Sequence, residues 1–224
     1  SRVVLHAVVF DLDDTLAVTD RDRETLLSTA ADRAGVSISF DREAYLEAHR
    51  EHSGRRTRQP VFEALVDTEA AELTAAYREA IGEALTPVEG AGALLSTLRT
   101  RYRLGLLTDG PDETQRDKLR RLGWTETFDA TVVTGPLGAP KPDRRAFEAI
   151  TDALGVAPHQ SVYVGDDPER DIAGAAAAGL RPVQVCYAGG PELHPDAVAT
   201  VDRNDLASLV GRVESLFDDG SDDA

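Results

Sequence analysis

The sequence alternates short apolar runs, typical of buried strands, with longer runs of helical periodicity, most regularly from residue 87 onward. We predict strands over residues 3–10, 103–108, 130–134, 161–165 and 182–186. When a helix separates two strands, the chain returns through the helix, so the strands can lie parallel in one sheet. The pattern therefore predicts an α/β fold with a Rossmann-like parallel sheet and helices on both faces.

Residues 22–84 contain no strand-like run and are predicted to be helical. We expect helices there over residues 22–34, 41–52, 60–67 and 69–84, and elsewhere over 90–100, 112–122, 143–154, 169–178 and 204–217. The helical block interrupts the alternation directly after the first strand. We therefore predict a small all-helical cap domain (residues 17–86) inserted into a catalytic core of residues 1–16 and 87–224.

The chain is strongly acidic, with 40 Asp and Glu against 24 Lys and Arg and a net charge of −16. Only Lys118 and Lys141 are lysines. This composition favours a halophilic protein, in which salt screens surface charges, over an ordinary acidic protein. A nucleic-acid partner is not expected, because binding a phosphate backbone requires clustered positive charge.

The remaining composition indicates a protein of the cytoplasm. No apolar run approaches the roughly 20 residues needed to span a bilayer, so we expect no membrane partner. The single cysteine, Cys186, excludes an internal disulfide and is typical of a reducing compartment. We expect a monomer or a weak homodimer.

Charged and polar residues follow four of the predicted strands. They are Asp11 and Asp13 after the first, Thr108, Asp109 and Gly110 after the second, Lys141 after the third, and Asp166 and Asp171 after the fourth. The carboxyl ends of parallel strands lie at one edge of a sheet, so we expect these side chains to converge. Mg²⁺ usually takes one or two carboxylates together with water and phosphate oxygens. The sequence therefore predicts a Mg²⁺ site that uses Asp11 and Asp166, where the cation offsets carboxylate repulsion.

Three residues at the same edge are suited to hold a phosphoryl group. The ammonium of Lys141 is compact and flexible, and can contact a nucleophile and a phosphoryl oxygen together. Thr108 offers a hydroxyl hydrogen bond to the same group. Gly110 opens the turn so that backbone amides can approach the anion. These three residues are the predicted phosphate-binding set, and the neighbouring Asp109 is included as a substrate-binding candidate.

The set resembles the motifs of the haloacid dehalogenase (HAD)-like hydrolase superfamily, in its phosphatase branch with a helical cap after the first strand. Asp11-Leu12-Asp13-Asp14-Thr15 resembles the first motif, Asp-x-Asp-x-Thr, Thr108 the second, Lys141 the third, and Asp166 with Asp171 the fourth. The resemblance extends from the first strand to about residue 187. An ordered set of four motifs is far more specific than a single Asp-x-Asp.

The resemblance implies a Mg²⁺-dependent phosphomonoesterase that acts on a small phosphorylated metabolite. Asp11 would attack phosphorus to form an aspartyl-phosphate, and Asp13 would protonate the leaving oxygen and then activate water. The metal would be held by the Asp11 carboxylate, the Asp13 backbone carbonyl and Asp166, with Asp171 acting through water or orienting its neighbours. Thr108 and Lys141 would neutralise charge on the transferring group.

Two other functions share these features. A phosphomutase of the same superfamily has the same motifs and cap position, and differs in returning the phosphoryl group to a sugar. A non-catalytic binding domain is a further alternative, against which the complete catalytic set argues.

Asp13 itself favours phosphate transfer over dehalogenation, because a halide leaving group needs no proton. Asp109 departs from the asparagine of many relatives, and adds negative charge near the substrate unless it points away or pairs with a cation.

Residues 49–58 form the one basic segment in this acidic chain, and carry four arginines at positions 50, 55, 56 and 58. A solvated loop between cap helices is one interpretation. The alternative is that Arg55 and Arg58 face the active site and bind the leaving group of the substrate through a second anion.

Overall fold

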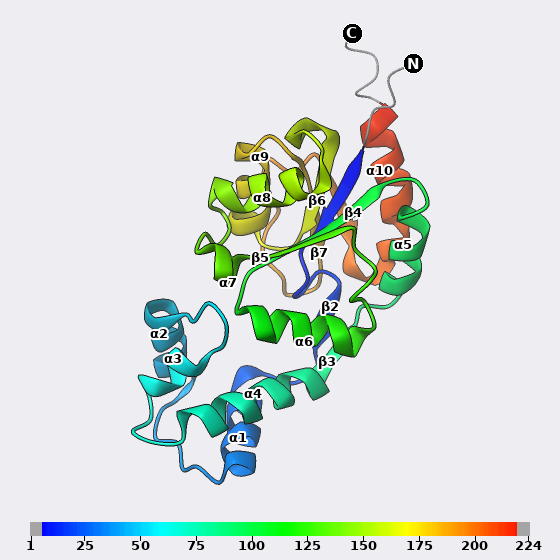
Figure 1. Ribbon diagram of the computed structural model, residues 1–224. Coiled ribbons are helices and arrows are strands. Elements are labelled where there is room, and N and C mark those ends of the chain that lie inside the picture. The colour runs from blue at the N-terminus through cyan, green and yellow to red at the C-terminus, as the bar shows by residue number, and fades with distance from the viewer. Residues whose placement is uncertain (1–5, 219–224) are drawn as a thin grey trace.

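The computed structural model describes residues 6–218 and contains a six-stranded sheet in the order β5-β4-β1-β6-β7-β8 (Figure 1). All neighbouring strands run parallel. The strands are β1 (Ala7–Phe10), β4 (Arg103–Thr108), β5 (Ala130–Val133), β6 (Ser161–Gly165), β7 (Arg181–Cys186) and β8 (Ala199–Asp202). The predicted α/β class is confirmed. Residues 3–5 of the predicted first strand, like the tail from residue 219, lie outside the described residues.

The strand order reverses at β1. The chain extends from β1 through β4 to β5 on one side, and then returns to β6, β7 and β8 on the other. Phe10 pairs with Leu106 and with Val164, so β1, β4 and β6 end at the same edge. Ligands of open parallel sheets bind at the carboxyl edge where the order reverses. The topology therefore places the ends of β1, β4 and β6 at the expected binding position.

Helices cover both faces of the sheet and make up most of the predicted cap. They are α1 (Arg23–Ala34), α2 (Arg42–His52), α3 (Gln59–Glu63), α4 (Ala70–Ala84), α5 (Ala91–Leu98), α6 (Asp112–Leu122), α7 (Thr134–Leu137), α8 (Arg144–Leu154), α9 (Gly174–Ala177) and α10 (Leu209–Asp218), with the short helical turns η1 (Pro158–Gln160), η2 (Pro168–Ala173) and η3 (Arg203–Ser208). Within residues 6–218, none of these helices has the length and apolar character needed to cross a membrane.

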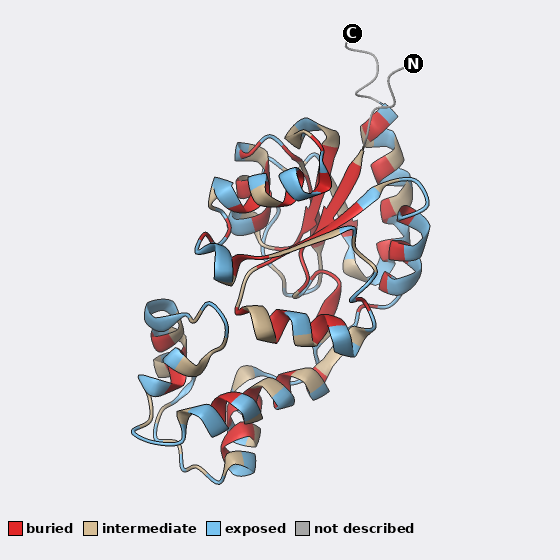
Figure 2. Cartoon of the chain, viewed as in Figure 1, coloured by how far each residue is buried: buried red, intermediate tan, exposed pale blue. Residues whose placement is uncertain are grey.

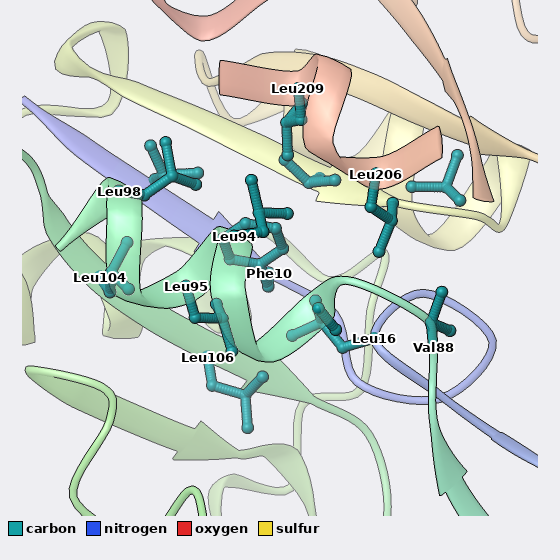
Figure 3. Packing of buried hydrophobic residues seen from close by; sticks show 14 of the residues in the cluster. Phe10, Leu16, Val88, Leu94, Leu95, Leu98, Leu104, Leu106, Leu206 and Leu209 are labelled. Atoms are coloured by element: carbon teal, nitrogen blue, oxygen red, sulfur yellow. The ribbon is translucent and has the colours of Figure 1, made fainter. Parts of the chain in front are cut away.

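Alternate side chains of β1 are buried on opposite faces of the sheet, as the two-residue period of a strand requires. Val8 and Phe10 belong to the cluster that includes α5 and α10, and Figure 3 shows Phe10 beside Leu94 of α5. Ala7 and Val9 belong to the cluster that includes α8 and α9. Figure 2 shows buried residues along the central strands and on the inner sides of these helices. With both faces covered, the carboxyl edge remains for the site.

The helices α1–α4 pack around a separate apolar cluster below the sheet (Figures 1 and 2). At its centre Tyr45, Phe62 and Tyr77 have ring centroids 5.5–5.7 Å apart and are at most 1% exposed. The predicted all-helical block also contains an antiparallel pair, β2 (Ala17–Thr19) and β3 (Leu85–Pro87). Strands of three residues are too short for a periodic signal. The domain boundaries at residues 16 and 87 stay a prediction.

The loop between α2 and α3, in the predicted cap, contacts the first turn of α6. The carbonyl oxygens of Arg55 and Arg56 accept hydrogen bonds from the backbone N–H groups of Asp112 and Glu113, both at 3.0 Å. These amides belong to the helix start, where N–H groups have no partner within the helix. The Glu113 carboxylate also forms ion pairs with Arg56 at 2.8 Å and Arg78 at 2.9 Å. The basic segment therefore lies against the edge of the sheet at which the strands end.

Candidate active site

The chain turns sharply after β1 and thereby places the predicted nucleophile at the sheet edge. The Asp14 N–H donates to the Ala17 carbonyl at 2.8 Å, and the Leu16 N–H donates to the Leu12 carbonyl at 2.9 Å. Asp14 has φ of 65°, a conformation that aspartate tolerates better than most residues. Asp11, directly before this turn, is 7% exposed. Its carboxylate is therefore nearly buried and needs partners.

Lys141 is the principal partner of Asp11. Its buried ammonium donates hydrogen bonds to Asp11 Oδ1 at 3.0 Å, Asp171 Oδ1 at 2.7 Å and the Tyr163 hydroxyl at 2.9 Å. The Tyr163 hydroxyl in turn donates to Asp171 Oδ1 at 2.9 Å. Burial lowers the pKa of Lys141, but the charges of Asp11 and Asp171 outweigh it and raise that pKa well above its usual value. The side chain therefore stays a cation at the centre of the site.

The turn η2 places Asp171 against the end of β6. This turn is π-helical, a geometry frequent at functional sites. The Asp167 N–H donates to Asp171 Oδ2 at 3.0 Å. A Cβ atom at Gly165 would lie 2.5 Å from Asp171 Cγ, so glycine is required there for the close approach. Because protein groups donate to both Asp171 oxygens, this residue is suited to position Lys141.

Asp11, Asp166 and Asp171 form a cluster in which one oxygen of each lies within 4.8 Å of the others. Burial raises the pKa of Asp11 well above its usual value, against the lowering effect of Lys141, and neighbouring carboxylates add to the rise. Burial and Asp171 raise the pKa of Asp166 to about 6. Three carboxylates around one ammonium leave negative charge that is not neutralised, and oxygen ligands suit a hard divalent cation. The residues present therefore fit a metal site.

Two hydroxyl groups complete the surroundings of Asp166. Thr15 Oγ1 lies 3.4 Å from Asp166 Oδ1 and 3.5 Å from Asp11 Oδ2, and so links the two carboxylates. The Tyr187 hydroxyl donates to Asp166 Oδ2 at 3.1 Å. These contacts fix the direction of the Asp166 carboxylate relative to Asp11.

Asp13 has different partners from Asp11. Its Oδ1 accepts from Lys118 at 2.7 Å and its Oδ2 accepts from Gln115 at 2.9 Å, both on α6. Burial raises the pKa of Asp13. The charge and hydrogen bond of Lys118, together with the hydrogen bond from Gln115, outweigh this effect and hold the pKa below its usual value. The Asp13 carboxylate is not part of the cluster of Asp11, Asp166 and Asp171. Metal binding by the Asp13 backbone carbonyl stays a prediction.

Thr108 and Asp109 connect the end of β4 to the same network. The Thr108 hydroxyl is buried and accepts from Gln115 Nε2 at 2.7 Å. Asp109 Oδ1 accepts from the Thr134 hydroxyl at 2.8 Å and from the Lys141 N–H at 3.0 Å, and Oδ2 lies 3.8 Å from Arg170. Arg170 and two hydrogen-bond donors therefore compensate the negative charge of Asp109. This meets the condition, inferred from the sequence, for an anionic substrate to bind nearby.

Three cavities meet at the sheet edge, and Asp109 lines all of them. Each cavity extends to different elements. The smallest, about 110 Å³, is lined by Asp11, Asp13, Asp14, Asp109, Lys141, Asp166, Arg170 and Asp171. A second, about 320 Å³, shares Asp13 with it and extends to Arg58 in the cap. A third, about 450 Å³, is lined by Arg55, Arg58 and Gly110 among others. Six of the predicted core residues thus line the small cavity, namely Asp11, Asp13, Asp109, Lys141, Asp166 and Asp171. Gly110 and the two arginines line the adjoining space, whereas Thr108 lines none of the three cavities and reaches the site through Gln115.

Sequence reasoning missed five side chains of the site: Gln115, Lys118, Tyr163, Arg170 and Tyr187. Lys118 alone had a signal, because it is one of only two lysines in the chain and both contact a site aspartate. Tyr163 lies inside a buried strand, where an aromatic residue is ordinarily packing.

The chain is similar to known phosphatases. A family model described as haloacid dehalogenase-like hydrolase matches residues 5–179. A glyceraldehyde 3-phosphate phosphatase from Methanopyrus kandleri is 31% identical over 198 residues, which cover 81% of this chain and 84% of that protein. A phosphoserine phosphatase from Thermus thermophilus is 38% identical over 120 residues, or 53% of this chain, and the match spans only 48% of that protein. The crystal structure of a HAD phosphatase from Thermococcus onnurineus has a TM-score of 0.68 at 26% identity, covering 92% of this chain and 98% of that one.

Proposed function

Because the chain belongs to the haloacid dehalogenase-like hydrolase family, we propose that it is a Mg²⁺-dependent phosphomonoesterase of small phosphorylated metabolites. The observation that carries the proposal is the Lys141 ammonium, which contacts Asp11 at 3.0 Å and Asp171 at 2.7 Å beside Asp166. Residues from the chain segments that follow β1, β5 and β6 form this arrangement, which suits nucleophilic attack by Asp11 on a phosphoryl group.

In the first half of the reaction, a carboxylate oxygen of Asp11 forms a bond to phosphorus and the bond to the leaving oxygen breaks. Lys141 fixes the other carboxylate oxygen and neutralises charge on the transferring group. The Thr108 hydroxyl accepts from Gln115 at 2.7 Å and donates only a long bond of 3.5 Å to the Asp109 carbonyl, so its hydrogen can turn to a phosphoryl oxygen. A divalent cation held by Asp11 and Asp166 would supply further charge neutralisation and would favour the ionised form of Asp11.

Asp13 moves the proton in both halves. Lys118 and Gln115 lower the pKa of Asp13 and so favour its ionised form when no substrate is bound. The ionised carboxylate is suited to remove a proton from the water that attacks the aspartyl-phosphate. The dianionic phosphoryl group of an incoming substrate raises the Asp13 pKa, since a like charge disfavours the carboxylate. Asp13 can then carry the proton that the leaving oxygen needs.

The proposal is tested by phosphate release from a panel of phosphomonoesters with and without MgCl₂, in wild type and in Asp11→Asn. We expect Mg²⁺-dependent release by the wild type and none by the variant. Asp152→Asn, at an exposed position of α8, removes the same charge outside the site and should remain active. Activity retained in Asp11→Asn would contradict the nucleophile assignment, and isomerised sugar phosphate in place of free phosphate would identify a phosphomutase.

A further inference from the structure

We propose that Arg23, His49 and Arg58 of the cap form a second anion-binding site, which selects phosphomonoesters whose leaving group bears its own negative charge. The charged group is a carboxylate or a second phosphoryl group, both of which guanidinium groups bind with paired hydrogen bonds. The inference rests on the proposed function, because the first phosphoryl group is taken to bind at Asp11.

Tyr77 of α4 holds both arginines close to each other. The Arg58 guanidinium carbon lies 5.6 Å from the centre of the Tyr77 ring, and Arg23 donates to the Tyr77 hydroxyl at 3.2 Å. Tyr77 is 1% exposed, and both arginines are half-buried. Two cations are therefore fixed on one buried aromatic side chain, where long side chains lose little further freedom on binding a ligand.

Neither arginine has a carboxylate within 4.0 Å among the residues that the structure describes. Arg58 Nε is buried and has no hydrogen-bond partner in that part of the chain, and the one side-chain hydrogen bond of Arg58 there is a long one of 3.4 Å to the Thr114 hydroxyl. Its charge acts on Asp13 from beyond ion-pair distance. A half-buried guanidinium with one nitrogen buried and without a hydrogen-bond partner is unfavourable, and two neighbouring cations repel each other. In a chain of 40 acidic residues, an anion from solution is the missing partner.

His49 adds a neutral donor or acceptor to this pair. Burial lowers its pKa, and the charges of Arg58 and Arg23 lower it further, to about 4. The imidazole is therefore uncharged at neutral pH and contributes hydrogen bonding without adding a third repelling charge.

The three residues face the side of the site from which the leaving group departs. All of them line the cavity of about 320 Å³, together with Asp13 and Lys118. Asp13 also lines the small cavity around Asp11, and in the proposed mechanism it contacts the leaving oxygen. A leaving group bound next to Asp13 therefore extends from the reacting phosphorus toward Arg58.

The structure separates the two arginines that the sequence placed together. Arg55 has an exposed side chain that lies beside Gly138, where an added Cβ would be 3.3 Å from its Nη2 atom, and its carbonyl contacts Asp112. It lines only the outer cavity of about 450 Å³. Arg58 is therefore the specificity residue of the proposal.

The test uses substrate pairs that differ in the charge of the leaving group. They are 3-phosphoglycerate against glycerol 3-phosphate for the carboxylate, and fructose 1,6-bisphosphate against fructose 6-phosphate for the second phosphoryl group. We expect a higher kcat/KM for the charged member of at least one pair, and the pair that shows it identifies the charged group. Arg58→Gln should lower kcat/KM of that member by about 10- to 100-fold, mainly through KM, as for loss of charge-assisted hydrogen bonds. The uncharged member should be nearly unaffected.

Arg42→Gln is the matched control, because Arg42 is an exposed cap arginine that lines none of the three cavities. Arg58→Lys should recover part of the loss, and Arg23→Gln should reproduce it if Arg58→Gln unfolds. Equal losses on both members of a pair, or a wild-type preference for the uncharged members, would overturn the second site while leaving the phosphatase function intact.

Calorimetry separates this failure from failure of the proposed function. If the wild type hydrolyses nothing with Mg²⁺, the proposed function is wrong, and binding of 3-phosphoglycerate and fructose 1,6-bisphosphate is then compared in wild type and Arg58→Gln. Binding that depends on Arg58 supports the anion site without turnover, whereas binding that does not depend on it, or no binding, overturns the site.

Discussion

Replacement of Asp166 with asparagine should stabilise the metal-free protein at neutral pH. Burial and the nearby Asp171 raise the pKa of Asp166 from 3.8 to about 6. The folded protein therefore keeps this proton to a higher pH than the unfolded chain does. The free energy of unfolding consequently falls as the pH rises from 3.8 to about 6, and the penalty is complete above that range.

The size of the effect follows from the shift. A rise of about two pKa units corresponds to about 3 kcal/mol at neutral pH, since each unit is about 1.4 kcal/mol. The amide of asparagine retains one oxygen acceptor, and thus loses one of the bonds that Asp166 accepts from Thr15 and Tyr187. That loss costs about 1 kcal/mol. We expect Asp166→Asn to gain about 2 kcal/mol of stability at pH 7.5 and to lose about 1 kcal/mol at pH 4.

Urea unfolding with a chelator present, at pH 7.5 and pH 4, measures both values. Asp152→Asn is the control for simple loss of one negative charge from a chain of net charge −16. Added Mg²⁺ should stabilise the wild type more at pH 7.5 than at pH 5, because its ligands must be deprotonated, and should leave Asp166→Asn unchanged. If the variant is less stable than wild type by the same amount at both pH values, the pKa of Asp166 is not raised in the folded protein and the prediction is wrong.

Three further perturbations test other contacts of the site. Lys118→Gln removes the ion pair of Asp13, so the acid limb of the pH–rate profile should move to higher pH and kcat should fall by about 10- to 100-fold; an unmoved limb would show that Lys118 does not act through Asp13. Lys141→Met leaves Asp11 and Asp171 without their buried cation, so activity should be lost and urea unfolding should show a loss of about 3–5 kcal/mol, whereas a gain in stability would refute the pairing. Molar KCl should raise the thermal midpoint by screening the negative surface, and a midpoint that falls would count against salt adaptation.

The sheet could be predicted because each central strand is a continuous apolar run bounded by turn residues. The predicted ranges 103–108 and 161–165 agree with β4 and β6. The strands β2 and β3 have three residues each, and β8 is a half-exposed edge strand of four, so none of them carries a period that sequence can show. The helix predicted over 169–178 is a π-helical turn followed by one α-helical turn, a difference that depends on the packing of Asp171.

The site could be predicted where its residues follow strands, because parallel strands bring their ends together whatever their separation in sequence. Asp11, Lys141 and Asp166 are of this kind. Lys118 lies within α6, and its contact with Asp13 depends on which face of that helix points to the edge. Arg55 and Arg58 lie in a loop without periodicity, so only the fold determines which of them faces the site.

Trapping the phosphorylated protein tests the central claim, that Asp11 takes the phosphoryl group, most directly. In Asp13→Asn, p-nitrophenyl phosphate should still react with Asp11, because p-nitrophenolate leaves without a proton, but the water that follows has no base. Mass spectrometry of the acid-quenched protein should then find one phosphoryl group on the peptide that contains Asp11. Release of p-nitrophenol with that peptide unmodified, or with the phosphoryl group on another residue, would contradict the account.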